Sequence, residues 1–179
     1  LVLAWSMSEI SRELHTADFL IASLGDSLPA SALPATIFVL AAFTAFSTGS
    51  SWGAMGILLP LVLPLCWAIM NSQGLAGPEG HHILYASVSG VLAGAVWGDH
   101  CSPISDTTVM SSLSAGCDHM EHVRTQLPYA MLAGAAALFC GIVPTSLGLP
   151  WWAGMLLAAA VTALGLRLLG EPVEDYRPQ

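Results

Sequence analysis

Long apolar runs separated by short polar or Pro/Gly-rich stretches dominate this chain. A membrane-spanning helix needs about 20 predominantly apolar residues, and several runs come close to that length or exceed it. They cover residues 34–72, 83–115, 127–147 and 151–169. The last two runs are uninterrupted and are joined by the short "GLP" at 148–150, which predicts an antiparallel helix pair.

Each of the first two runs carries a polar interruption. The stretch "FSTGSSWG" at 46–53 places glycines and hydroxyl residues inside the first run, and "GDHCSPISDTTVMSS" at 98–112 adds aspartates, a histidine, a cysteine and a proline to the second. Both segments share one design, which is apolar, then rich in Gly, Ser and Thr, then apolar again. The sequence therefore predicts two interrupted helical segments, broken or re-entrant.

The ends of the chain are more polar than its middle. Residues 1–24 contain several charged side chains, which predicts the end of one helix followed by an amphipathic or interfacial piece. The segment 171–179 predicts a short polar tail. The expected fold class is all-α, a polytopic integral membrane protein with a single transmembrane domain over residues 1–170.

Composition supports a membrane protein and excludes some partners. Hydrophobic residues make up 55% of the chain and charged residues only 9%, whereas a soluble domain has about 25% charged residues. Mean hydropathy is +0.70. The formal net charge of -8 with only four Lys and Arg argues against nucleic acid, which is bound by basic patches. The lipid bilayer is the expected environment.

The two interruptions predict an internal site. An unpaired backbone group in hydrocarbon costs several kcal/mol, so non-helical backbone at membrane depth persists only where protein or a water-filled cavity surrounds it. Transporters use broken helices in this way, because helix ends and freed carbonyls can bind ions. In this chain the pair of breaks lies at 47–53 and 98–106.

Side chains in both breaks suit a hard cation. Asp99 and Asp106 lie where an ionised carboxylate costs roughly 2.5 to 3.5 kcal/mol, and hydroxyl oxygens surround them in the sequence. Oxygen ligands are what hard cations prefer. The candidate ion- and proton-binding residues are Asp99, Asp106, Ser102, Ser105, Thr107, Thr108, Ser47, Thr48, Ser50 and Ser51. We expect no cofactor and no metal other than a transported Na+.

Simpler interpretations stand beside these. Asp106 or Ser105 suits an N-cap of the helix that follows, and Ser and Thr often donate to the i-4 carbonyl inside membrane helices. His100 is a candidate proton relay because it neighbours Asp99, although a local structural pairing explains it as well. The "CDHMEHVR" cluster at 117–124 fits a surface loop better than a metal site, and a pH sensor is a further interpretation of its histidines.

The motifs "GDHCSPISDTTVMSS" and "FSTGSSWGAMGILLPLVLPL" together resemble the paired signature of the NhaC-type Na+/H+ antiporter family, within the broader ion-transporter group. The similarity extends to "LAWSMSEISRELHTADFL" at 3–20 and "CDHMEHVRTQLPYA" at 117–130. Position by position it carries over the candidate residues above together with His100, Gly49 and Trp52. At 48–52 the chain has "TGSSW" where the family pattern is closer to "TGTSW", which keeps the hydroxyl.

This resemblance implies a secondary active transporter of the plasma (inner) membrane that exchanges Na+ for H+ by alternating access. Members are typically more than twice as long and have two halves of opposite topology. The chain therefore resembles a C-terminal half or fragment, whose partner would be the N-terminal half of the same protein, and self-association stays open. Two alternatives also stay open: exchange of a small organic anion of the malate or lactate type, and, from another class, an intramembrane metalloenzyme.

Overall fold

The computed structural model describes residues 6, 9–10, 13–24 and 28–170. The predicted polar tail and part of the N-terminal segment 1–24 lie outside these residues. The elements are α2 (Thr16–Leu24), η1 (Ala30–Ala32), α3 (Leu33–Thr48), α4 (Ser51–Ser72), η2 (Pro78–Gly80), α5 (His81–Cys101), α6 (Asp106–Ala115), α7 (His119–Ala136), η3 (Ala137–Ile142), α8 (Val143–Ser146) and α9 (Trp151–Leu169).

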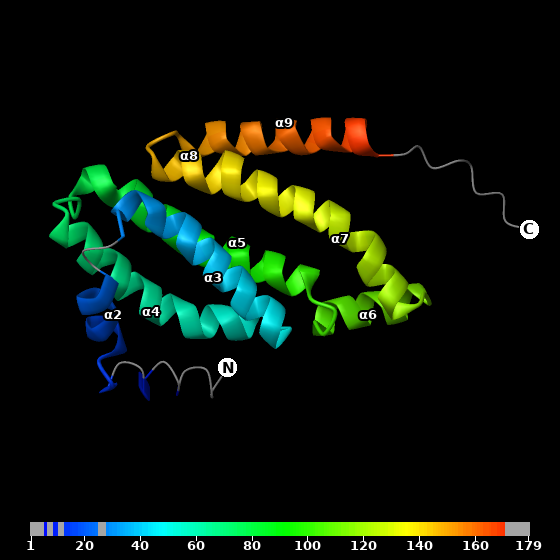
Figure 1. Cartoon of the computed structure of the whole chain (residues 1–179), viewed down its shortest axis with the longest axis horizontal. Helices are drawn as coiled ribbons and strands as arrows, with labels where there is room; N and C mark the ends of the chain where they lie inside the picture. The colour runs from blue at the N-terminus through cyan, green and yellow to red at the C-terminus, as the bar shows by residue number, and fades with distance from the viewer. Residues whose placement is uncertain (1–5, 7–8, 11–12, 25–27, 171–179) are drawn as a thin grey trace, which may run out of the picture.

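The predicted all-α, polytopic membrane fold is confirmed. Within the described part of the chain, four helical stretches are long and apolar enough to cross a membrane: Ala30–Thr48, Ser51–Ser72, His119–Ser146 and Trp151–Leu168. Helix α5 is also 21 residues long, but it is richer in glycine and polar residues. It lies in the middle of the molecule, with α3 and α4 on one side and α7 on the other (Figure 1).

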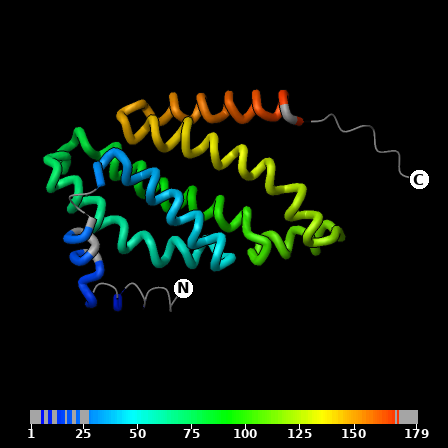
Figure 2. Tube along the Cα trace, in the orientation of Figure 1, coloured from blue at the N-terminus to red at the C-terminus, as the bar shows by residue number. Residues whose placement is uncertain are grey.

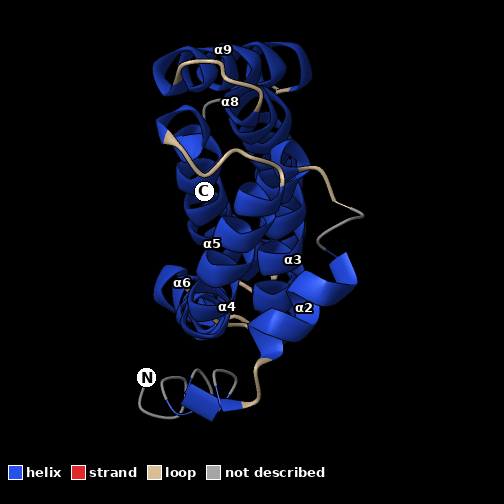
Figure 3. Cartoon of the chain, turned by 90° about the vertical axis from the view of Figure 1, so that its left-hand side faces the viewer, coloured by secondary structure: helices blue, strands red, loops and turns tan. Residues whose placement is uncertain are grey.

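The helices stack in layers. Figure 3 shows α9 at one edge, α8 beneath it, then α5 beside α3, with α4 and α2 at the opposite edge, and Figure 1 shows α7 between α9 and α5. Trp97 joins α5 to α7, because its indole Nε1 donates to the Ala130 carbonyl at 2.7 Å. The same ring stacks on Phe38 of α3, with centroids 5.5 Å apart. One aromatic side chain therefore joins three helices, α3, α5 and α7.

The first predicted interruption separates two spans. Helix α3 ends at Thr48, Gly49 adopts a left-handed φ of 66°, and Ser50 is the N-cap of α4, accepting a hydrogen bond from Gly53 N at 3.3 Å. Helix α4 then runs back beside α3, as the tube in Figure 2 shows. A helix rises about 1.5 Å per residue, so the 22 residues of α4 are long enough to cross a hydrocarbon core of about 30 Å. Helix α3 reaches a comparable length together with η1, as the 19-residue stretch Ala30–Thr48.

Helices α3 and α5 make the most extensive helix contact. Three glycines of α5 face α3, and a Cβ at any of them would press on an α3 carbonyl oxygen: Gly90 on Pro34, Gly94 on Phe38 and Gly98 on Ala42. Small residues at such a spacing let membrane helices approach closely. The close approach brings the C-terminal ends of α3 and α5 together, and these are the ends at which both interruptions begin.

The second interruption divides a helix in a different way. Helix α5 ends at Cys101, residues 102–105 form a short bridge, and α6 continues outward for 10 residues. At about 1.5 Å per residue, α6 is far too short to cross a membrane. Figure 1 shows it projecting from the end of α5 rather than turning back.

The C-terminal antiparallel helix pair is present, with an earlier start than predicted. The first helix begins at His119, not near 127, because Asp118 caps it by accepting from Met120 N and Glu121 N, both at 3.0 Å. It widens into the π-helix η3 before ending in α8. A turn with Gly148 at φ 96° leads to α9. The residues interpreted as a surface loop are therefore the cap and first turn of a helix.

Candidate functional site

The bridge between α5 and α6 is built from serines that satisfy the freed backbone groups. Ser102 N donates to the Asp99 carbonyl at 3.0 Å, and Ser105 N donates to the Ser102 carbonyl at 3.3 Å. Val109 N then donates to the Ser105 carbonyl at 2.9 Å, which starts α6. Both serine side chains are fully buried. The polar side chains of this motif that lie inside the protein are Asp99, Ser102, Ser105, Thr108 and Ser112.

Asp99 is the buried carboxylate of the site. Its side chain is only 5% exposed and lies in the last turn of α5, facing the start of α6. Ser105 Oγ donates to Asp99 Oδ1 at 2.8 Å, and Thr107 Oγ1 lies 3.2 Å from Asp99 Oδ2. The α6 N-terminus adds a positive dipole end beside this carboxylate.

Asp99, Ser105 and Thr107 form a closed ring of contacts. The third side of the ring is the 2.7 Å separation between Ser105 Oγ and Thr107 Oγ1. Three hydrogen bonds need three hydrogens, and the two hydroxyls supply only two. A protonated Asp99 supplies the third and completes the ring, whereas an ionised Asp99 leaves one oxygen pair without a hydrogen. By this hydrogen count one proton completes the ring, of which Asp99 and Ser105 are buried and Thr107 is exposed.

Thr108, which follows Thr107 in α6, has an unsatisfied buried oxygen. Its side chain is 3% exposed, and its Oγ1 is a buried oxygen with no hydrogen-bond partner within the described chain. Buried polar groups are normally paired, and each exception calls for an explanation. One explanation is that this hydroxyl contacts a ligand only in another state of the protein.

Asp106 lies in a different environment from Asp99. It is exposed at the first turn of α6, and its Oδ1 accepts from Thr107 N at 2.8 Å. This bond goes to the next residue in the chain, whereas an N-cap side chain accepts from an amide two or three residues further on. The N-cap position of α6 is Ser105, whose side chain makes no capping bond and donates to Asp99 instead, so neither Asp106 nor Ser105 forms the side-chain cap suggested by the sequence. The structure therefore separates the two carboxylates that sequence reasoning treated alike.

The first break contributes fewer buried groups. Ser47 and Thr48 are exposed, and Ser50 and Ser51 are half-buried. The Thr48 hydroxyl donates to the Thr44 carbonyl at 2.9 Å, which is the local i-4 bonding expected of Thr in a helix. These hydroxyls stay candidates by their position, and their side chains do not share the hydrogen-bonded ring of Asp99.

Two contacts nevertheless hold the breaks together. Ser102 Oγ donates to the Phe46 carbonyl at 2.8 Å, so a serine of the second break satisfies a carbonyl freed near the end of α3. A Cβ at Gly49 would lie 2.8 Å from the Ile104 carbonyl oxygen, so only glycine fits there without a shift. The two interruptions are about fifty residues apart in sequence and touch in space.

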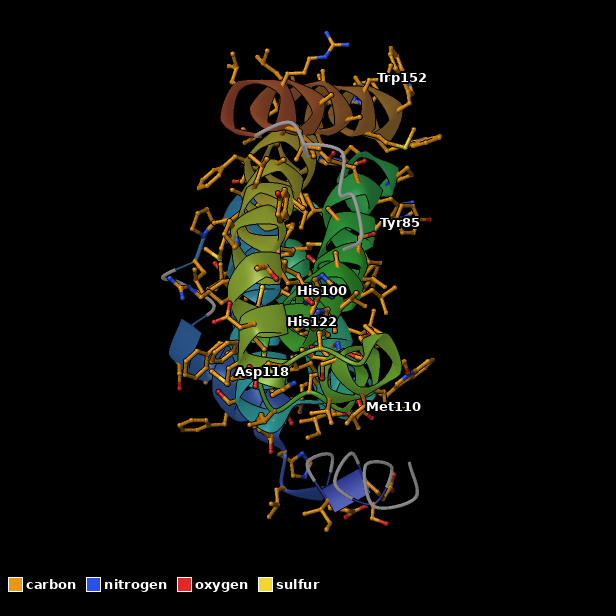
Figure 4. The ribbon with its side chains drawn as sticks, turned by 90° about the vertical axis from the view of Figure 1, so that its right-hand side faces the viewer. Tyr85, His100, Met110, Asp118, His122 and Trp152 are labelled. Atoms are coloured by element: carbon orange, nitrogen blue, oxygen red, sulfur yellow. The ribbon has the colours of Figure 1, made fainter. Side chains whose placement is uncertain are left out.

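His100 points away from Asp99. Its side chain is exposed and lines an apolar pocket of about 780 Å³ between α5 and α7, together with Trp97 and Tyr129. In Figure 4 the residue lies in the middle of the view, near His122. Its backbone carbonyl accepts from Gln126 Nε2 at 2.6 Å. Neighbouring residues on a helix lie about 100° apart, so adjacency in sequence does not bring the two side chains together.

Two contributors were missed or misplaced by sequence reasoning. Gln126 of α7 satisfies a carbonyl at the end of α5, and the only signal for it was a polar residue just before an apolar run. His119 lies half-buried at the start of α7 and contacts both the bridge and α6. Across the described residues, no three His, Cys, Asp or Glu side chains gather to hold a metal ion.

A buried carboxylate beside a broken helix, within a bundle of membrane-spanning helices, is the arrangement of secondary transporters. Fold and site thus define a polytopic transport protein. A model of the Na+/H+ antiporter family matches residues 1–144. The chain belongs to this Na+/H+ antiporter family, as the motifs of the two breaks predicted.

Several curated proteins are similar to the chain. An uncharacterized protein of Haemophilus influenzae is 45% identical over 136 residues, which are 76% of this chain and 24% of that protein. An uncharacterized Na+/H+ antiporter of the same species is 33% identical, covering 60% of this chain and 21% of that protein. The malate-2H+/Na+-lactate antiporter of Bacillus subtilis is 31% identical, covering 64% and 19%. No solved structure matches the chain.

The matched region spans a quarter or less of the length of these relatives, since the shares run from 19% to 24%. The described helices therefore correspond to one part of proteins of that size. Membership of the family does not by itself identify the ions or molecules that a whole protein of this kind transports.

Proposed function

We propose that this chain carries the ion-binding part of an antiporter that exchanges Na+ for H+ across the plasma (inner) membrane. The observation that supports it is the ring of Asp99, Ser105 and Thr107, because a single proton completes it. The family assignment and the relative named a Na+/H+ antiporter support the same pair of ions. The remaining partner is the rest of the transporter, including an N-terminal half.

Exchange follows from competition for one carboxylate. A proton on Asp99 closes the ring, and loss of that proton leaves a negative charge among hydroxyl oxygens with free lone pairs. Na+ is a hard cation that such oxygens suit. In this scheme Thr108 Oγ1, which is buried and unpaired, is a further ligand for the Na+-bound state. Alternating access then requires that only the loaded ring crosses between the two sides of the membrane.

The test is sodium-driven proton flux in proteoliposomes that contain the full-length protein. Asp99→Asn keeps the shape of the side chain but removes the carboxylate, and we expect flux to fall to background. Asp106→Asn alters an exposed carboxylate and is expected to reduce flux far less. In the unmodified protein, the half-saturating Na+ concentration should rise as pH falls while the maximal rate is retained. Flux that survives in Asp99→Asn would exclude this proposal.

A second candidate is exchange of a small organic anion. The relative named a malate-2H+/Na+-lactate antiporter favours it, and a helix N-terminus such as that of α6 attracts carboxylates. Thermal stabilisation of the purified protein by malate or lactate in the absence of Na+ would support this candidate. Stabilisation by Na+ alone, unaffected by either anion, supports exchange of Na+ for H+.

A further inference from the structure

The first turns of α7 contact the break between α5 and α6, which the end of α3 contacts as well. Gln126 Nε2 donates to the His100 carbonyl at 2.6 Å, which satisfies the end of α5. His119 makes two further contacts, one to the bridge and one to α6. Figure 4 looks onto this end of the molecule, with Asp118 marking where α7 begins beside α6.

The His119 ring is fixed at both nitrogens. Nε2 lies 2.7 Å from the Pro103 carbonyl oxygen, and a carbonyl only accepts, so Nε2 carries the hydrogen. Nδ1 lies 3.0 Å from Ser112 Oγ, and the same hydroxyl lies 2.8 Å from the Val109 carbonyl oxygen. Because Ser112 has one hydrogen, its bond to Nδ1 competes with its bond to Val109, and the Pro103 bond is the stronger anchor of the half-buried ring. A histidine bonded in this way has one position and one ring orientation.

These two anchors bracket the residues that surround Asp99. Pro103 lies in the bridge, between Ser102 and Ser105. Ser112 is buried on α6, one turn beyond Thr108 and on the same helix face. The outer face of α6 is exposed, with Met110 at 67% and Leu113 at 74%, so contacts of the inner face position this short helix.

We propose that His119 is a positioning residue of the ion site, which acts through Pro103 and Ser112 and does not touch the ion. This inference rests on the proposed function, because the site it positions is the Asp99 ring. By fixing the bridge and α6 at the same time, His119 sets how far Thr107 and Thr108 lie from Asp99. Loosening α6 would therefore weaken Na+ binding more than it slows the exchange cycle.

The experiment measures exchange by the full-length protein in proteoliposomes as a function of Na+ concentration. His119→Ala removes both anchors, and we expect the half-saturating Na+ concentration to rise about three- to tenfold, the range that hydrogen bonds of this kind correspond to. His119→Gln places an amide donor near the position of Nε2 and should restore the Pro103 contact, bringing the value back to within about twofold of the original. His122→Gln, one turn along the same helix, is the matched control and should leave the value unchanged.

A merely structural role predicts a different pattern. In that case His119→Ala lowers the maximal rate and the melting temperature, while the half-saturating Na+ concentration stays the same, and this result overturns the inference. If His119→Ala does not fold, Ser112→Ala removes one anchor only and must still raise the half-saturating concentration. Stabilisation of the purified variants by added NaCl reports binding without transport and should require more Na+ in the anchor variants.

Asp99→Asn in the same vesicles separates the two proposals. If Asp99→Asn is inactive but the His119 and Ser112 variants keep the original half-saturating concentration, the positioning role alone fails. If Asp99→Asn exchanges normally, the proposed function fails and the His119 inference falls with it.

Discussion

The two helix breaks touch each other but are closed by different means. At the first, Gly49 and Ser50 reverse the chain, and nearby hydroxyls bond locally, as Thr48 does to the Thr44 carbonyl. At the second, the chain continues through 102–105, and its polar groups are satisfied by other elements. Ser102 bonds to α3, whereas Pro103 is held by α7.

The first break therefore connects two helices, whereas the second forms the candidate site. The first turn bonds the Thr48 and Ser50 hydroxyls locally and takes one bond from the second break, from Ser102 Oγ to the Phe46 carbonyl. A bridge that depends on α3, α6 and α7 shifts when any of them moves, and it holds the buried Asp99. Under the proposed alternating access, which needs a site that responds to helix movement, the second break is the part expected to move and the first is its supporting wall.

The largest effect is expected where the wall meets the bridge. Gly49 and Gly116 both have a left-handed φ, 66° and 64°, but only Gly49 has a neighbour, the Ile104 carbonyl. Gly116→Ala should cost about 1–2 kcal/mol of stability from its backbone conformation alone. Gly49→Ala adds overpacking and should cost about 2–4 kcal/mol. Thermal unfolding in detergent checks both, and equal losses would show that the breaks do not press on each other.

The bond between the breaks gives the next effect. Ser102→Ala removes the donor to the Phe46 carbonyl and leaves that carbonyl unpaired, which should destabilise the protein by about 1–3 kcal/mol. Ser47→Ala alters an exposed hydroxyl in the first break and should stay within about 0.5 kcal/mol. Unfolding midpoints of the two variants give the comparison. If Ser47→Ala lowered the stability as much as Ser102→Ala, the Ser47 hydroxyl would stabilise the first break through an interaction other than those described above.

Much of this architecture follows from the sequence. The apolar runs predict the spans, and the interruptions at 46–53 and 98–112 predict where helices end, because both rest on local composition. Hydropathy predicts a start of α7 near residue 127, which is too late. The polar first turn "HMEH", which follows the capping Asp118, already belongs to this helix. A capping aspartate ahead of a polar turn resembles a loop when only hydropathy is considered.

The site was predicted in its residue types but not in its arrangement. Asp99 and Asp106 look equivalent along the chain, and only the position of α6 buries one and exposes the other. The role of His100 was inferred from adjacency, which a helix does not preserve. His119 contacts Pro103 across the fold, and such a contact depends on how α6 and α7 meet, which no local pattern in the sequence encodes.

Apart from the Ser47→Ala control, the smallest change in stability is expected from Thr108→Val, which also gives the sharpest distinction between the breaks. Removing an unpaired buried hydroxyl should stabilise the sodium-free protein by about 1 kcal/mol, because an unsatisfied group carries a desolvation penalty. If Thr108 binds Na+ beside Asp99, the same variant should need more Na+ for half-maximal exchange. Stability and ion binding thus move in opposite directions, as expected of a polar group retained for a ligand. A variant that is less stable and binds Na+ normally would instead show that Thr108 has a structural partner.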